Sequence, residues 1–442
     1  MTILERIMEQ LQVREMHEIP SAMQKTLLDD NKRNDFFDTL EPYYSYDAIL
    51  AEFEKHSADR KNYMQDYTPR CILDIVAGIT PIGRKVRDMC AGIGGLSLAK
   101  YERNPNIQLH LEEYSKNAIA FLLLNLLINK IGGAIVSEKN VLTGEVFQRY
   151  AVNSPVAGCK WGRVSKLEDG ISDDMYAIDM VVSNPPYSQS WNPIHSDVFN
   201  GFKSPPKSKA DYAFVLNGLH SLDSNGTAVF ILPHGVLFRG QAEGDIRREL
   251  IRRNWLDTVI GLPEKLFTNT DIPVCILLFR KNRTHDDVLF IDAQKDFEKL
   301  KSKNTMTAEH IRKVIDTCLQ RTEIDAYSRR VRVNEIIDND YNLNIPRYVD
   351  SFEPEPIPDA IELAKELNQI NDESRKVGLE LLTILKELVC TNPINAKEHE
   401  EFVSEFEKFL TSADGAVTVA EQEVVVAKLQ EVKRYLLNKI FV

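Results

Sequence analysis

The stretch KVRDMCAGIGG, residues 85–95, decides the fold class of this chain. It reads as a short β-strand, a glycine-rich turn and the start of a helix. Further short apolar runs alternate with amphipathic stretches on its C-terminal side, at 107–111, 178–183, 226–232, 256–262 and 273–279. Strands separated by helices of ten or more residues are typical of βαβ units. The sequence therefore predicts an α/β fold with a doubly wound, mostly parallel sheet.

The sequence predicts that the whole chain has three parts. Apolar residues at helical spacing predict a helical N-terminal region over 1–60, ahead of the α/β domain at 61–350. The proline cluster EPEPIPDA (353–360) indicates a linker, and residues 351–442 are expected to form C-terminal helices. The polar segment 145–176 lacks clear periodicity and is predicted to be a loop insertion.

Composition excludes several classes of protein. The 442 residues are 43% hydrophobic and 27% charged, which excludes a disordered chain. The net charge is −12, and residues 351–442 contribute −8 of it, from 18 acidic and 10 basic side chains. This balance argues against a protein that holds nucleic acid over its whole surface, but it leaves room for a local basic surface before residue 351.

No stretch approaches the ~18 to 20 apolar residues that span a bilayer, and MTILERIMEQ does not resemble a secretory signal. We therefore expect no membrane association. The six cysteines lie far apart without a CxxC pair, which argues against a zinc site and against a disulfide framework. A reducing cytoplasm is the expected location.

The stretch SNPPY (183–187) follows the apolar run IDMVV directly. Two prolines force the chain to leave the strand in a rigid, extended turn. The Asn184 side-chain carbonyl and the Pro185 backbone carbonyl could then accept both hydrogens of a planar –NH₂ group, beside the aromatic face of Tyr187. The alternative is an ordinary strand-to-loop turn that Asn184 caps and the prolines, including Pro186, stiffen.

The glycine-rich turn DMCAGIGG (88–95) would let a ligand approach the backbone at a helix N-terminus. It does not fit GxGxxG, because Ser97 stands at the third glycine position, and it has no P-loop lysine. A nucleoside is therefore favoured over a dinucleotide or a triphosphate. Glu113, at the end of the next strand, could accept both hydroxyls of a ribose. A purely structural turn remains the alternative.

The stretch DYTPR (66–70) precedes the apolar helical pattern CILDIVAGI. Thr68 is predicted to be the N-cap and Pro69 the first helical residue. Free backbone N–H groups at such a terminus could bind a carboxylate. An ordinary capped helix start is the alternative.

Together these motifs resemble the amino-group DNA methyltransferases, most closely the modification subunit of type I restriction–modification systems. The resemblance covers about residues 60–350 and includes the long segments 232–250, 259–279 and 339–349. It implies a Rossmann-like methyltransferase sheet. It also implies methyl transfer from S-adenosyl-L-methionine to N6 of an adenine flipped out of double-stranded DNA.

The resemblance also implies residue roles. Asn184 and Pro185 would hold N6 and Tyr187 would stack on the adenine, with Pro186 completing the motif. The cofactor site would include Tyr67, Thr68, Pro69, Asp88, Gly92, Gly94, Glu113 and Asn140. Among these, Thr68 would meet the cofactor carboxylate, Asp88 the region of its amino group, and Glu113 its ribose. Asn140 stands where the family often has an aspartate that contacts the cofactor adenine.

The expected partners follow from size and charge. No contiguous stretch remains for a separate DNA-reading domain, so we expect a specificity subunit, with the C-terminal helices (361–440) packing against it. Intramolecular packing of those helices is the alternative, and a restriction (nuclease) subunit is left open. A solvated helix face is expected for Arg239, Arg247, Arg248, Arg252 and Arg253, with DNA contact as the alternative. Two other functions stay open: methylation of an RNA base or a protein glutamine, and a catalytically silent scaffold.

Overall fold

The computed structural model describes residues 2–56, 67–157, 159–168, 178–193, 197–268, 270–301, 303–351, 360–388 and 393–411. The chain divides into two compact units, Met1–Phe352 and Glu353–Val442, and each is described by itself.

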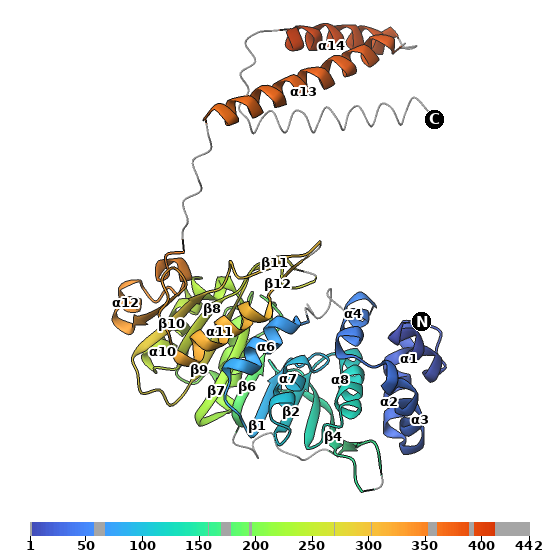
Figure 1. The fold of residues 1–442 in the computed structure, drawn as a ribbon, viewed down its shortest axis with the longest axis vertical. Helices are drawn as coiled ribbons and strands as arrows, with labels where there is room; N and C mark the ends of the chain where they lie inside the picture. The colour runs from blue at the N-terminus through green and yellow to red at the C-terminus, as the bar shows by residue number, and fades with distance from the viewer. Residues whose placement is uncertain are drawn as a thin grey trace. The chain divides into compact units, whose positions relative to one another are not determined.

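The first unit is built on an eleven-stranded sheet with the order β13-β10-β8-β9-β7-β6-β1-β2-β3-β4-β5 (Figure 1). Its strands are β1 (Lys85–Met89), β2 (Gln108–Glu113), β3 (Ala134–Lys139), β4 (Val146–Asn153), β5 (Arg163–Leu167), β6 (Ile178–Ser183), β7 (Leu222–Pro233), β8 (Leu256–Gly261), β9 (Val274–Arg280), β10 (Asp287–Asp292) and β13 (Ser328–Arg332). The short strands β11 (Glu298–Lys299) and β12 (Asn304–Thr305) pair separately.

The centre of the sheet is parallel, as the sequence predicts. Strands β3, β2, β1, β6 and β7 pair in parallel, and so do β8 and β10. Strand β9 runs antiparallel between β7 and β8, while β4, β5 and β13 add antiparallel pairs at the edges. The sheet is therefore mixed, and the carboxyl ends of its central strands share one edge.

Helices cover both faces of this sheet. The helices are α1 (Ile3–Leu11), α2 (Ile19–Leu28), α3 (Asp30–Leu40), α4 (Tyr46–His56), α6 (Arg70–Ile79), α7 (Gly95–Arg103), α8 (Lys116–Ile128), α9 (Asp211–Ser221), α10 (Ala242–Arg252), α11 (Ala308–Gln320) and α12 (Val333–Asp338). Buried side chains of α6, α7, α8 and α11 belong to one hydrophobic core, and those of α9, α10 and α12 belong to another. Successive residues of a strand place their side chains alternately in the two cores, as expected for a doubly wound sheet.

The N-terminal helices share a core with the sheet domain. Figure 1 shows these helices, in blue, beside α8. Phe53 of α4 packs edge-on against Phe121 of α8, with ring centroids 4.7 Å apart. Phe37 of α3 contacts the buried Trp161 at 5.0 Å. The described residues 2–56 thus share one hydrophobic core with the sheet domain.

The prediction of a loop at 145–176 is wrong for its described part. Strands β4 and β5 form an antiparallel extension of the sheet, with Tyr150 and Trp161 buried against the N-terminal helices. Strand β5 is at the edge of the sheet, and β4 lies between it and β3. The polar Gln148 and Lys166 share a face with the buried Tyr150 and Val164, so they interrupt the apolar alternation of these strands. Residues 158 and 169–177 lie outside the described part of the chain.

The second unit contains two long helices, α13 (Ala360–Glu387) and α14 (Pro393–Thr411). Leu381, Leu382 and Leu385 are buried in it, whereas Phe402 and Phe409 are 56% and 52% exposed. The helix predicted near 424–437 and the linker at 353–359 lie outside the described residues. Among the helices that the structure describes, none is long and apolar enough to cross a membrane.

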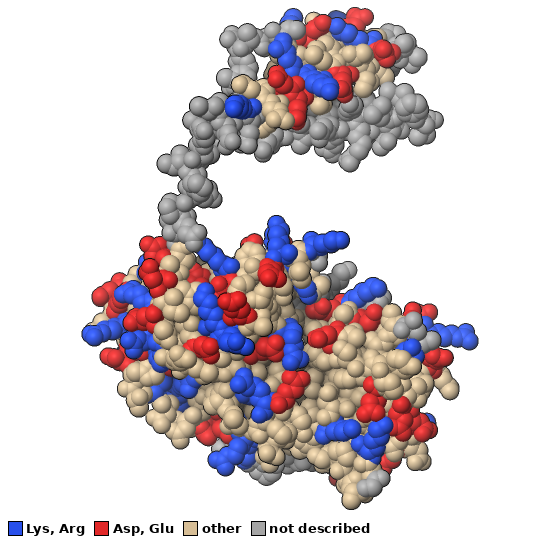
Figure 2. Space-filling view, in the orientation of Figure 1, with Lys and Arg blue, Asp and Glu red and all other residues tan. Residues whose placement is uncertain are grey.

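Charges of both signs are interspersed on the face of the first unit that Figure 2 shows. Of the arginines expected at the surface, one is buried and another is only partly exposed. Arg247 is buried and donates to the carbonyls of Val236 and Tyr341, and Arg239 pairs with the buried Asp211. The prediction of a solvated face holds for Arg248, which pairs with Asp245 at the surface.

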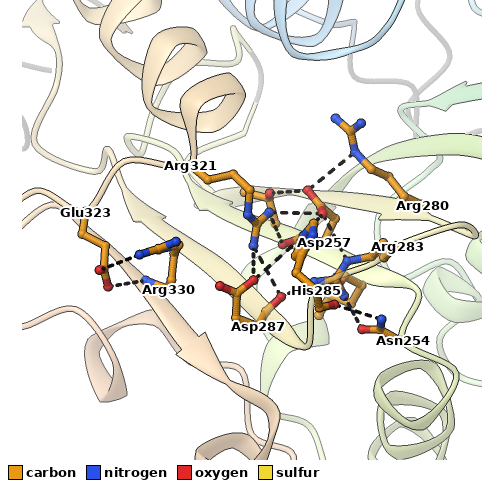
Figure 3. Close-up of polar contacts among 11 residues, drawn as sticks. Asn254, Asp257, Arg280, Arg283, His285, Asp287, Arg321, Glu323 and Arg330 are labelled. Atoms are coloured by element: carbon orange, nitrogen blue, oxygen red, sulfur yellow. Dashed lines mark hydrogen bonds and ion pairs between the residues drawn. The ribbon is translucent and has the colours of Figure 1, made fainter.

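A buried charged cluster lies at the amino end of β8, on the edge of the sheet opposite the carboxyl ends of the central strands. Figure 3 shows Arg321 between Asp257 and Asp287, at 3.1 Å and 2.6 Å. Arg283 and His285 also approach the Asp257 carboxylate, at 3.2 Å and 3.1 Å. Burial would raise the pKa of Asp257, but the surrounding arginines outweigh it and hold that pKa below its usual range. The cluster ties β8, β10 and α11 together.

Candidate active site

A cavity of about 280 Å³ opens at the carboxyl ends of β1, β2, β3 and β6. This is the edge at which open α/β sheets bind ligands. Its wall contains most of the residues that the sequence singles out: Tyr67, Thr68, Gly92, Glu113, Asn140, Asn184, Pro185, Pro186 and Tyr187. Pro69, Asp88 and Gly94 are close in sequence but are not part of the wall.

The NPPY corner is fixed to the neighbouring strand and to the cavity wall. At the end of β6, the Ser183 hydroxyl donates to the Met89 carbonyl at 2.6 Å, which joins the ends of β6 and β1. The Asn184 amide donates through Nδ2 to the Thr68 hydroxyl at 2.9 Å, and its Oδ1 accepts from the Tyr187 hydroxyl at 2.7 Å. The amide plane of Asn184 is therefore held from both sides.

The side chain of Tyr187 is also fixed by its neighbours. Its side chain is buried, and its ring meets Phe267 edge-on with centroids 5.9 Å apart. Because the hydroxyl is bonded to Asn184 and the edge is packed, the orientation of the ring is set before any ligand binds.

The glycine-rich turn needs its glycines for a steric reason. Gly92 and Gly94 have φ angles of +57° and +96°, which side-chain-bearing residues rarely adopt. A Cβ on Gly92 would also lie 2.9 Å from Cε1 of Tyr67, closer than a real contact allows. The turn therefore lies directly against the Tyr67 ring, and α7 begins immediately after it.

Glu113 joins the end of β2 to this turn. Its carboxylate accepts from the backbone N–H of Gly92 at 2.8 Å, of Tyr114 at 2.9 Å and of Ser115 at 2.8 Å. Burial raises the pKa of Glu113, and these three hydrogen bonds partly offset that effect. A carboxylate has about four acceptor positions, so one remains for a ligand hydroxyl.

Tyr67 supplies an observation that points to a polar ligand. Its hydroxyl is buried on the cavity wall and has no hydrogen-bond partner among the described residues. Burial and the nearby Glu113 carboxylate raise the pKa of this phenol. Because buried hydroxyls are normally satisfied, a ligand with polar groups fits this wall better than a purely apolar one.

The helix start at DYTPR differs from the expectation. Helix α6 begins at Arg70, so Pro69 occupies the N-cap position with extended backbone (φ −62°, ψ 150°) and Thr68 precedes it. The Thr68 hydroxyl accepts from Asn184 instead of capping the helix. The prediction of Thr68 as N-cap is wrong because a tertiary partner engages the side chain.

Asp88 also differs from the expectation of a direct cofactor contact. It is fully buried below the turn, where the Ser97 hydroxyl of α7 donates to Oδ2 at 2.6 Å. Oδ1 has no partner among the described residues. Burial raises the pKa of Asp88 to about 7, although the bond from Ser97 acts in the opposite direction. Asp88 supports the turn from behind.

Asn140 lies on the cavity wall just after β3. Its side-chain oxygen accepts from the backbone N–H of Leu142 at 3.1 Å and of Thr143 at 3.2 Å, as in an Asx-turn. The oxygen is therefore committed to the local turn, which leaves the –NH₂ end for other contacts.

The sequence analysis missed a buried ion network beside Glu113. Glu112 accepts from Arg87 at 2.7 Å and from Lys139 at 2.8 Å, and both Glu112 and Lys139 line the cavity. Burial alone would raise the pKa of Glu112, but the two cations hold it below its usual range. The consecutive acids at the end of β2 are the only signal in the sequence, and they do not reveal the partners.

The parallel centre, the glycine-rich turn after β1, the acid at the end of β2 and the corner after β6 define a Rossmann-like methyltransferase fold. The chain belongs to the N-6 DNA methylase family, whose model matches residues 38–356.

Known relatives support this family assignment. The chain is 29% identical over 378 residues to the MpnII type I restriction enzyme methylase subunit of Mycoplasma pneumoniae, covering 77% of this chain and 66% of the relative. It is 29% identical over 328 residues to the MjaVII methylase subunit of Methanocaldococcus jannaschii, covering 70% and 53%. The match thus spans about half to two-thirds of these relatives.

Among solved structures, the chain is similar to the type I restriction-modification system methyltransferase subunit from Streptococcus thermophilus. The two share 28% identity and a TM-score of 0.61, with 79% of each chain covered.

Proposed function

We propose that this chain is the modification subunit of a type I restriction–modification system. It would transfer a methyl group from S-adenosyl-L-methionine to N6 of adenine in double-stranded DNA. One observation carries the proposal: the Asn184–Tyr187 corner shares a cavity with Gly92, Glu113 and the Tyr67 hydroxyl, which has no hydrogen-bond partner among the described residues. A planar amine and a nucleoside can therefore meet there.

The cofactor half of the cavity is the wall near β1 and β2. S-adenosyl-L-methionine supplies an electrophilic methyl group on its sulfonium when bound. The remaining acceptor position of Glu113 would bind a ribose hydroxyl, and the Tyr67 hydroxyl would gain a partner that the described part of the chain does not supply. Gly92, without a side chain, leaves the backbone open to close approach.

The substrate half is the NPPY corner. The lone pair of adenine N6 is delocalised into the ring, so the nitrogen is a weak nucleophile. Acceptance of its hydrogens by Asn184 Oδ1 and the Pro185 carbonyl would localise that pair and stabilise the positive charge that develops on nitrogen. Tyr187 would stack on the extruded base. The bond from Asn184 Nδ2 to Thr68 keeps the amide oxygen on the corner side.

Partners follow from charge and from the second unit. A chain of net charge −12 is poorly suited to hold DNA alone, so a specificity subunit would supply most of the DNA contact. The exposed Phe402 and Phe409 of α14 are suited to pack against helices of that subunit. A restriction subunit would join the same assembly, and the expected location is the cytoplasm, where the DNA lies.

The test is methyl transfer by the complex of this chain with its specificity subunit. Labelled cofactor is offered with plasmid DNA, with RNA and with a translation factor that carries a methylatable glutamine. We expect label in DNA alone and its loss in Asn184→Ala. Label only in RNA or protein, or no label with any substrate, would contradict the proposal.

A further inference from the structure

The chain leaves the NPPY corner through a strained residue. Ser188, directly after Tyr187, has φ +50°, a left-handed conformation that residues with a side chain rarely adopt. Its backbone N–H donates to Asp211 Oδ1 at 2.8 Å, and its hydroxyl lies 3.4 Å from Oδ2. Such a conformation persists only where its surroundings hold it, and here Asp211 does so.

Asp211 itself needs a cation. It is the first residue of α9 and is fully buried, and a buried carboxylate without a partner is strongly destabilising. Arg239 supplies the charge, with Nη2 donating to Asp211 Oδ2 at 2.7 Å. The same guanidinium donates through Nη1 to the Ser188 hydroxyl at 3.3 Å and pairs through Nε with Glu243 at 2.7 Å.

Three hydrogen bonds hold the backbone just before Arg239. The carbonyl of Val236 accepts from Tyr212 at 2.9 Å and from Arg247 at 3.0 Å. The carbonyl of Leu237 accepts from the N–H of Leu343 at 2.8 Å. Two segments that resemble the family, 232–250 and 339–349, therefore meet at the turn before Arg239. Neither contributes to the wall of the cavity.

We infer that Arg239 is a positioning residue that fixes the NPPY corner through Asp211 and Ser188. This inference rests on the proposed function and adds a role for a side chain that touches neither cofactor nor base. Without the guanidinium, Asp211 loses its counter-charge, Ser188 is free to relax from the left-handed region, and the corner loses its set orientation. Displacement of a reacting group by about 1 Å can cost about 10²-fold in rate.

The experiment uses the complex of this chain with its specificity subunit and the variant Arg239→Ala. The matched control is Arg248→Ala, which removes a surface arginine of α10 paired with Asp245. The readouts are kcat, KM for DNA, the cofactor Kd by calorimetry, and the fluorescence of 2-aminopurine placed at the target base. Ethylguanidinium at low millimolar concentration tests chemical rescue.

We expect Arg239→Ala to lower kcat by about 10²-fold. The cofactor Kd should stay within a factor of two, the 2-aminopurine signal should change, and ethylguanidinium should restore part of kcat. Arg239→Lys, which keeps the charge, and Asp211→Asn, which keeps the acceptor, should lose less activity. These two variants also serve if Arg239→Ala does not fold. Unchanged kcat in Arg239→Ala and Asp211→Asn, or equal losses of kcat and cofactor affinity without rescue, would overturn the inference. Failure of the wild-type complex to methylate DNA would instead refute the proposed function.

Discussion

Replacement of Glu113 by glutamine tests the cofactor half of the cavity. The carboxylate accepts from three backbone N–H groups, with Gly92 on one oxygen and Tyr114 and Ser115 on the other. A glutamine can keep the two bonds on one oxygen, but it then turns an –NH₂ donor toward the N–H of Gly92. One charge-assisted hydrogen bond is lost, worth about 1.5–3 kcal/mol.

This loss falls on the turn that would hold the cofactor, so the affinity for S-adenosyl-L-methionine should fall about 10- to 100-fold. Calorimetry at constant pH measures it directly. Asn184→Ala is the control, because that side chain bonds Thr68 and Tyr187 and none of the groups that Glu113 holds, and it should leave cofactor affinity nearly unchanged. An unaltered Kd in Glu113→Gln, with the fold intact by circular dichroism, would refute the assignment of this wall to the cofactor.

Three further predictions test separate parts of the account. Gly92→Ala, with φ +57° and a Cβ 2.9 Å from the Tyr67 ring, should lower the melting temperature and weaken cofactor binding. Gly133→Ala, with φ +68° and open space around its Cβ, should destabilise the protein without changing its affinity for the cofactor. Equal losses of cofactor affinity in the two glycine variants would contradict the steric argument. Asp88 has a folded pKa of about 7 against 3.8 unfolded, so its contribution to stability is full below pH 3.8 and is lost as the pH rises through 7. The free energy of unfolding of the wild type, measured by urea denaturation, should therefore fall by about 4 kcal/mol between pH 4 and pH 8, and Asp88→Asn should abolish this fall. A variant whose stability depends on pH as strongly as that of the wild type would contradict the prediction. Asp257→Ala leaves the buried Arg283 side chain and the partly exposed Arg321 without this carboxylate and should destabilise by about 3–5 kcal/mol, with cofactor affinity retained in the folded fraction. A fully stable Asp257→Ala protein would show that the cluster in Figure 3 is not structural.

Local sequence signals were sufficient for the elements that meet at the cavity. Glycines after β1 and prolines after β6 restrict the backbone whatever surrounds them, so the turn at Gly92 and the corner at Pro185 could be placed from sequence. Strand β6 also carries apolar residues on both faces, Met180, Val181 and Val182, which makes it recognisable.

Features that depend on distant partners could not be placed. Thr68 has the residue type of an N-cap, yet Asn184 engages its hydroxyl from another strand. Arg239 and Arg247 carry charges typical of a surface, and only the fold shows that Asp211 and backbone carbonyls receive them. Strands β4 and β5 were missed because Gln148 and Lys166 interrupt their apolar alternation, and the helices that pack on them, α2 and α8, come from elsewhere in the chain.

The most direct test of the central claim is base-resolved detection of N6-methyladenine. Genomic and plasmid DNA would be sequenced from a host that expresses this chain with its neighbouring reading frames, and from a matched host that carries Asn184→Ala. The account predicts methylated adenines at one recurrent site in the first host and none in the second. Modified adenines at equal levels in both hosts, or in neither, would contradict it.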